Sequence, residues 1–117
     1  TQIAGASDVF RGAVVSYASD VKHDVLHVSP GPVVSETAAA QMAQGAKDLL
    51  GADVGLALTG VAGPDQQDGQ PVGTLCVAVV LSDGQVHTKT FVLPGQREQM
   101  RQMSVISSLD MLRSLLA

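Results

Sequence analysis

Residues 59–64 carry the sequence Thr-Gly-Val-Ala-Gly-Pro, directly after the apolar run Val54 to Leu58. A β-rich run that ends in this way predicts a tight loop in which backbone amides and one hydroxyl can surround a ligand. Gly60 and Gly63 permit positive φ and close backbone approach, and Pro64 lacks an amide N–H and stiffens the exit. A plain tight turn is the alternative, so a binding role for this loop needs support from elsewhere in the chain.

Lys22 is the candidate for acid–base chemistry. Ser19 is a predicted N-cap for a short helix over Asp20 to Leu26, which places Lys22 in the first turn. The positive end of the helix dipole, together with partial burial, would disfavour the charged form and make Lys22 a possible general base. The alternative for Lys22 is a surface lysine that snorkels from the helix end. Tyr17 ends the preceding predicted strand and is a second candidate, for which the alternative is a half-buried core aromatic.

Arg97 is the candidate for binding an anion. It follows Pro94-Gly95-Gln96 at the predicted start of the last helix, where unpaired amides favour negative charge, and its guanidinium matches a phosphate group. Arg101 lies one turn further on the same face. The alternative is that Arg97 or Arg101 pairs with Glu98 or another surface carboxylate.

Other chemistries find little support in the sequence. His23, His27 and His87 lack metal-ligand spacing, so we expect no metal site, and we expect no cofactor. No Gly-x-Ser-x-Gly elbow is present. Cys76, the single cysteine, lies in the apolar run Leu75 to Leu81 and is expected to be a buried structural thiol.

Composition limits the class of protein. The chain has 117 residues, of which 45% are hydrophobic and 15% charged; this composition predicts one folded domain and excludes the class of disordered proteins. It has no 18-residue apolar stretch, so we expect no membrane partner. A net charge of −4 and only three aromatic residues disfavour nucleic acid, whereas a small phosphorylated molecule needs only a local positive spot. One cysteine and no signal peptide fit the cytoplasm.

The elements expected to position these residues alternate between strands and helices. The first half of the chain predicts a strand over Val9 to Tyr17, the short helix, and an amphipathic helix that begins at Ser35 and ends at Gly51. A strand over Val54 to Leu58 follows, and then a polar and mobile excursion over Asp65 to Gln70. The last elements are strands over Thr74 to Leu81 and Val86 to Leu93 and a helix whose one face carries Met103, Ile106, Leu109, Leu112 and Leu116. Asp83-Gly84 predicts an antiparallel hairpin. The pattern predicts an α/β fold with a mixed, mostly parallel sheet, in which ligands gather beyond the carboxyl ends of the strands.

Several separated stretches together resemble one family. They are Gly12-Ala13-Val14-Val15-Ser16-Tyr17 followed by Lys22, Val34-Ser35-Glu36, Thr59-Gly60-Val61-Ala62-Gly63-Pro64, Pro71-Val72-Gly73-Thr74 and Pro94-Gly95-Gln96-Arg97-Glu98. In this order they resemble the CinA C-terminal domain, a family that includes bacterial nicotinamide mononucleotide deamidases. The resemblance covers the chain from Ile3 onward and implies a three-layer α/β/α domain.

The resemblance also implies an activity. The family's deamidases are metal-free serine and lysine amidases that convert nicotinamide mononucleotide to nicotinic acid mononucleotide and ammonia in pyridine nucleotide salvage. By position, Lys22 would be the base that activates the serine and Tyr17 its hydrogen-bonding companion. Thr59 and the loop residues Gly60, Ala62 and Gly63 would hold the substrate or its oxyanion, and Arg97 would bind the 5′-phosphate.

This sequence departs from the family pattern in two places. The family's Glu-Ser-x-Thr-Gly-Gly motif, which carries the nucleophile, is absent from residues 1–117, so we expect an N-terminally incomplete domain without its first strand and most of its first helix. The stretch between Lys22 and Ser35 is also short, and Ser19 replaces a common Asn. A nucleotide-binding or interaction module without turnover is therefore the alternative, with an N-terminal molybdopterin-binding-like domain as its partner. The family also implies self-association.

Overall fold

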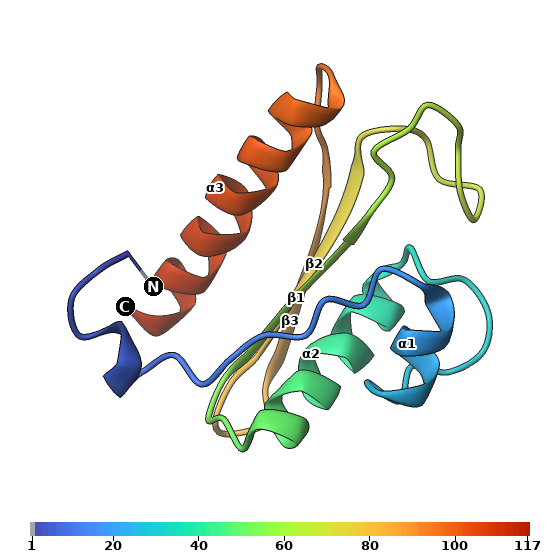
Figure 1. Cartoon of the computed structure of the whole chain (residues 1–117). Coiled ribbons are helices and arrows are strands. Elements are labelled where there is room, and N and C mark those ends of the chain that lie inside the picture. Colours follow the sequence, from blue (N-terminus) through green and yellow to red (C-terminus); the bar gives the residue numbers. More distant parts are fainter. Residues whose placement is uncertain (1) are drawn as a thin grey trace.

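The computed structural model describes residues 2–117 as an α/β domain of three layers. Figure 1 shows α3 on one face of a three-stranded sheet and α1 and α2 on the other. The elements in chain order are a 3₁₀ turn η1 (Ala6–Asp8), α1 (Ser19–Asp24), α2 (Glu36–Leu50), β1 (Gly55–Gly60), β2 (Thr74–Val80), β3 (Val86–Val92) and α3 (Arg97–Leu116). The predicted α/β class is confirmed, as is the predicted arrangement of helices on both faces.

The sheet has the strand order β1-β2-β3, and both of its pairs are antiparallel. The predicted hairpin is confirmed, with Val80 opposite Val86 across the turn at Asp83-Gly84. Every residue of β2 is buried, because this central strand has helices over both faces. The expectation of mostly parallel pairing is wrong for the strands that the structure describes.

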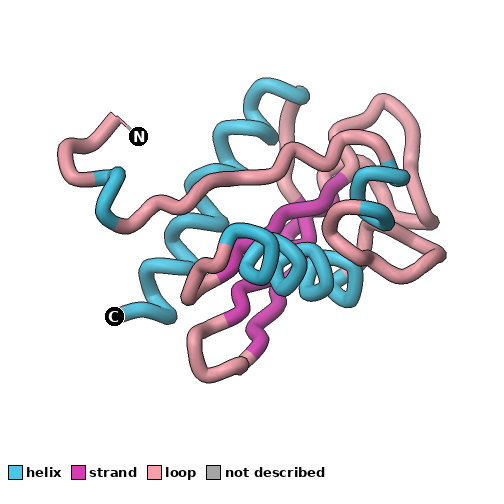
Figure 2. Tube along the Cα trace, turned by 60° about the horizontal axis from the view of Figure 1, so that its bottom comes forward, coloured by secondary structure: helices cyan, strands magenta, loops and turns pink. Residues whose placement is uncertain are grey.

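No parallel pair is found among residues 2–117, because β1 and β2 pair antiparallel and Val9 to Tyr17 does not form the predicted strand. This β-rich segment runs as a loop, drawn in pink in Figure 2, and Val15 is 86% exposed. Arg11 holds it against the end of α2 by donating from Nε to the Leu50 carbonyl at 2.9 Å. A strand needs a neighbour that completes its hydrogen bonds, and no strand described in residues 2–117 pairs with this segment.

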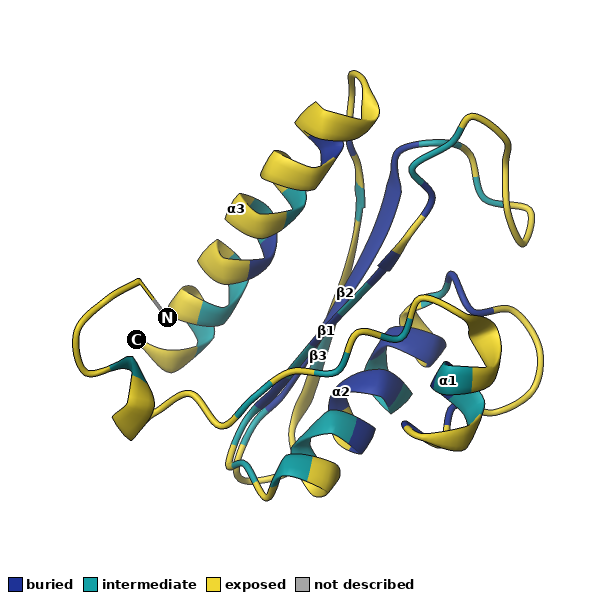
Figure 3. Cartoon of the chain, in the orientation of Figure 1, coloured by how far each residue is buried: buried dark blue, intermediate teal, exposed yellow. Residues whose placement is uncertain are grey.

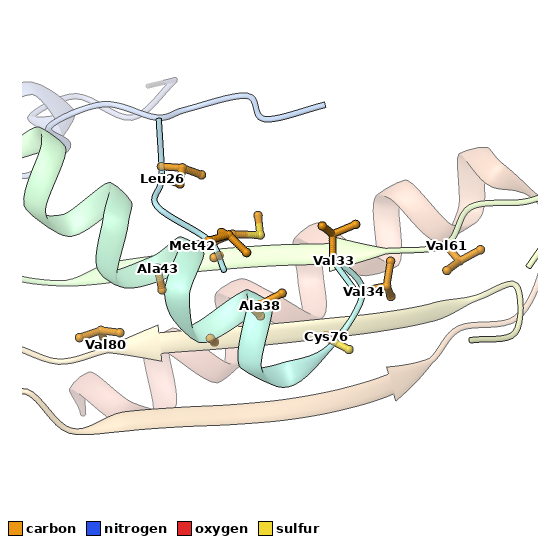
Figure 4. Packing of buried hydrophobic residues seen from close by; sticks show 13 residues of the cluster. Leu26, Val33, Val34, Ala38, Met42, Ala43, Val61, Cys76 and Val80 are labelled. Atoms are coloured by element: carbon orange, nitrogen blue, oxygen red, sulfur yellow. The ribbon is translucent and has the colours of Figure 1, made fainter. Parts of the chain in front are cut away.

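Helix α2 has the predicted ends. The Ser35 hydroxyl accepts a hydrogen bond from the Ala38 amide at 3.0 Å, and Gly51 ends the helix in the left-handed region with φ 60°. The buried face of the helix packs on the sheet (Figure 4). At Gly45 the helix approaches the backbone of Leu26 so closely that a Cβ would overlap with the Leu26 carbonyl oxygen.

The main core lies between α2 and the sheet and includes the Cys76 thiol, as predicted. A smaller cluster of Leu75, Val77, Leu93 and Met100 lies under the start of α3. The rest of α3 is largely exposed (Figure 3), and Ile106 and Leu109 of its predicted apolar face are 61% and 52% exposed. The predicted apolar face of α3 is therefore largely exposed, and the buried residues of this helix are instead Met100 and Ser108.

None of the helices described in residues 2–117 has both the length and the apolar character that a membrane crossing requires.

Candidate functional site

An open groove of about 1290 Å³ runs between the segment 8–17, β1 and the C-terminal half of α3. It brings together residues that are far apart in the sequence, from Asp8 to Leu116. All seven sequence-predicted site residues border it: Tyr17, Lys22, Thr59, Gly60, Ala62, Gly63 and Arg97. The groove is therefore the candidate site.

Lys22 is the buried base candidate of the groove. Its side chain is 9% exposed, and Nζ donates to the Ser16 carbonyl at 2.6 Å. Burial lowers the pKa of the Lys22 ammonium below the ordinary value of a lysine, because a desolvated charge is disfavoured. A lysine in this position can lose its proton more easily than one in water.

The prediction that Lys22 lies in the first turn of its helix, at the positive end of the dipole, is wrong. Helix α1 has six residues, its N-cap is Ala18 without a side-chain hydrogen bond, and Lys22 lies in the last turn. Ser19 is the first helical residue and does not cap the helix. The negative end of a helix dipole favours a cation, so burial alone accounts for the lowered pKa.

Tyr17 borders the groove, and its side chain is 90% exposed. Within residues 2–117 its hydroxyl makes no hydrogen bond to Lys22, whose ammonium donates to Ser16. The half-buried core position considered from the sequence is excluded by this exposure. A role for Tyr17 as the companion of Lys22 stays a prediction.

Thr59 lies inside β1, one residue before the end of the strand, and is 6% exposed. Its hydroxyl donates to the Val33 carbonyl at 2.6 Å, so this side chain joins the sheet to the segment before α2. The strand continues two residues beyond the predicted end at Leu58. Thr59 and Gly60 are therefore strand residues that border the groove, and the loop begins at Val61.

The loop amides divide into two groups. The Val61 amide donates to the Thr74 carbonyl at 2.9 Å and cannot serve a ligand. The amides of Ala62 and Gly63 make no hydrogen bond within residues 2–117 and border the groove. An oxyanion or a polar substrate group would therefore find its backbone donors at these two residues.

Arg97 reaches across to this loop. Its Nη2 atom donates to the Gly63 carbonyl at 2.7 Å, which leaves its other N–H groups for a ligand. Arg101 instead pairs with Glu98 at 3.2 Å, and both side chains are exposed. Of the two alternatives considered from the sequence, the surface pair therefore describes Arg101, and Arg97 belongs to the groove.

A comparison with known protein families shows to which family the chain belongs. The model of the CinA C-terminal domain matches residues 1–116. The chain belongs to the CinA C-terminal domain family.

Relatives of this CinA domain have similar sequences over its whole length. A CinA-like protein of Frankia casuarinae is 47% identical over all of the chain, and one of Mycobacterium tuberculosis is 40% identical. The chain spans 28% and 29% of those two proteins.

Solved structures support the same relationship. The competence/damage inducible protein CihA from Agrobacterium tumefaciens has a TM-score of 0.91 and 33% identity, with 98% of this CinA domain and 74% of that chain covered. The competence damage-inducible protein A from Klebsiella pneumoniae has a TM-score of 0.83 and 33% identity, with 88% and 67% covered.

Asp68 of this CinA domain was not among the residues predicted to belong to the site. Its carboxylate accepts hydrogen bonds from the backbone amides of Val33 and Val34, so the excursion over residues 65–70, expected to be mobile, is tied to the segment before α2. Asp68 and Gly69 both have positive φ and form a two-residue turn between Gln67 and Gln70. The Asp-Gly dipeptide is the signal that would have predicted this turn.

Proposed function

We propose that this domain belongs to a nicotinamide-nucleotide amidase, which hydrolyses the carboxamide of nicotinamide mononucleotide to give nicotinic acid mononucleotide and ammonia. The observation that supports this most directly is the groove shared by Lys22, Thr59 and Arg97, in which a buried lysine with a lowered pKa faces a space bounded by backbone donors and a cation. Family membership supports the same assignment.

The proposed chemistry has two steps. A serine oxygen attacks the carboxamide carbon as Lys22 takes the hydroxyl proton, and this proton then leaves with the nitrogen as ammonia. Water next attacks the acyl-serine ester, which releases the carboxylate product and restores the serine hydroxyl. We place this serine outside residues 1–117, because the Glu-Ser-x-Thr-Gly-Gly motif is not among them.

The residues of this chain have separate roles in the proposal. The Ser16 carbonyl accepts one N–H of Lys22 at 2.6 Å and so orients the amine, whose lone pair can face a hydroxyl in the groove. The free amides of Ala62 and Gly63 can stabilise the oxyanion. Arg97 binds the 5′-phosphate with the N–H groups that it does not donate to Gly63.

The experiment has two arms. Calorimetric titration of the 117-residue chain with nicotinamide mononucleotide measures binding, and ammonia release by the complete gene product measures turnover. Lys22→Ala should abolish turnover and retain binding. Lys89→Ala is the matched control, because this lysine lies on β3 outside the residues that line the groove.

A second function has one observation in its favour. The nucleophile motif is absent from the 117 residues, as expected for a nucleotide-binding module without turnover. Binding with no ammonia release by the complete gene product would support this module. Unchanged turnover in Lys22→Ala would contradict the proposed mechanism.

A further inference from the structure

A chain of hydrogen bonds links Asp68 to Thr59 through a single residue. One carboxylate oxygen of Asp68, Oδ2, accepts from the amides of Val33 and Val34 at 2.9 and 3.1 Å. The carbonyl of Val33 accepts from the Thr59 hydroxyl at 2.6 Å. Both backbone polar groups of Val33 are therefore used, one by each of these side chains.

The middle of this chain of bonds is buried. Val33 and Val34 are 5% and 2% exposed, and Figure 4 shows them over the sheet at the end where Val61 leaves β1. Asp68 is exposed and holds them from the outside, from a turn whose two central residues have positive φ. The Val33 carbonyl belongs to the same peptide group as the Val34 amide, so the hydrogen bond from this amide to Asp68 also holds the carbonyl in place. The packing of the two valine side chains holds it from the other side.

The hydroxyl of Thr59 has one hydrogen, and this hydrogen is committed to Val33. Toward the groove, which Thr59 borders, the oxygen can offer only its lone pairs. A ligand that forms a hydrogen bond with the Thr59 hydroxyl oxygen must therefore have an N–H or O–H donor. A carboxamide has such a donor in its NH₂ group, whereas a carboxylate has only acceptors and would face the lone pairs unfavourably.

We propose that Asp68 is a positioning residue that holds the Val33 carbonyl and so keeps Thr59 an acceptor, which gives the groove a preference for the carboxamide substrate over the carboxylate product. This inference rests on the proposed function, since it takes the ligand to be the nicotinamide nucleotide. It assigns to Asp68 an effect on selectivity without direct contact with the ligand.

The test compares two ligands that differ only at this group. The dissociation constants of nicotinamide mononucleotide and nicotinic acid mononucleotide are measured by calorimetry on the 117-residue chain at one pH and ionic strength. The wild-type chain should prefer the amide by about tenfold, the range expected for one buried hydrogen bond. Thr59→Val, which keeps the side-chain shape, should lower this preference to about twofold or less.

Two substitutions of Asp68 test whether its hydrogen bonds to Val33 and Val34 set the preference for the amide. Asp68→Ala removes the acceptor of both amides, so the preference should fall toward that of Thr59→Val, because the hydroxyl can then turn and donate. Asp68→Asn should keep most of the preference, since one side-chain carbonyl oxygen can still accept from both amides. Asp83→Ala is the matched control, because Asp83 likewise accepts from a backbone amide, that of Gln85 at 2.9 Å, in the β2–β3 turn.

Amide hydrogen exchange by NMR provides a readout that needs no ligand. The amides of Val33 and Val34 should exchange faster in Asp68→Ala than in the wild type and in Asp83→Ala. Faster exchange with an unchanged amide preference would overturn the positioning role and leave the proposed function intact. Binding of neither ligand would instead contradict the proposed function, and the inference with it.

Discussion

Arg97 at the first position of α3 donates to the carbonyl oxygen of Gly63 at 2.7 Å, across 34 residues of sequence. This bond fixes one edge of the guanidinium against the loop that follows β1. Arg97 and the loop residues Ala62 and Gly63 line the same groove, so one ligand can contact the cation and the backbone donors together.

Loss of Arg97 should weaken phosphate binding. Arg97→Ala should raise the dissociation constant of nicotinamide mononucleotide roughly 10- to 100-fold, because charge-assisted hydrogen bonds to the phosphate are lost. Nicotinamide riboside, which lacks the phosphate, should bind the variant and the wild type equally. Arg113→Ala is the control, since Arg113 pairs with Asp110 on the far part of α3. Equal weakening for both ligands would argue that Arg97 only supports the loop.

The pH dependence of turnover should report Lys22. Because burial lowers the pKa of Lys22, the neutral amine forms at lower pH than for an ordinary lysine. Ammonia release by the complete gene product should therefore rise with pH, with a midpoint below that ordinary value. Lys22→Arg should lose activity by about 100-fold or more at every pH, because a guanidinium stays protonated. An unchanged pH profile in this variant would remove Lys22 from the mechanism.

Glu36 should make stability depend on pH. Hydrogen bonds from Thr90 and Thr88 lower the pKa of the Glu36 carboxyl, so the folded chain binds this proton less readily than the unfolded chain. The contribution of Glu36 to the free energy of unfolding is fully present above the pKa that this carboxyl has in the unfolded chain. It is lost as the pH falls through the lower pKa of the folded chain. In thermal melts from pH 7 to pH 3, the difference in melting temperature between the wild type and Glu36→Gln should become smaller toward pH 3.

A control separates this contact from a general loss of charge. Glu98→Gln removes a carboxylate whose pair with Arg101 is exposed, and such pairs contribute little to stability. Its melting temperature should follow that of the wild type over the whole pH range. A gap for Glu36→Gln that stays constant down to pH 3 would contradict the assignment.

Gly45 should resist replacement, although it lies inside a helix. Alanine at a helix position is ordinarily favoured over glycine by about 1 kcal/mol. In Gly45→Ala the new Cβ would overlap with the Leu26 carbonyl, so we expect a net loss of about 1 to 3 kcal/mol in urea unfolding. Thr37→Ala, at an exposed position of the same helix, should change stability by about 0.5 kcal/mol or less. A Gly45→Ala variant as stable as the wild type would show that α2 can move away from Leu26.

Much of the fold was predictable because its signals are local. Periodic apolar residues between Ser35 and Gly51 predict α2 with both of its ends, and Asp83-Gly84 predicts the β2–β3 hairpin. The Val9 to Tyr17 segment shows the limit of such signals. Its β-branched residues favour extended backbone, but a strand exists only where a neighbouring strand accepts and donates its hydrogen bonds.

Local sequence patterns were enough to predict that the loop after β1, Lys22 and Arg97 are candidate site residues. The hydrogen-bond partners and the burial of these groups depend on how distant parts of the chain pack together. The cause of the lowered pKa of Lys22 is burial, not helix position, and the Thr59 proton is committed to Val33, 26 residues away. Donors and acceptors are used up by partners distant in the chain, and local sequence patterns do not carry that information.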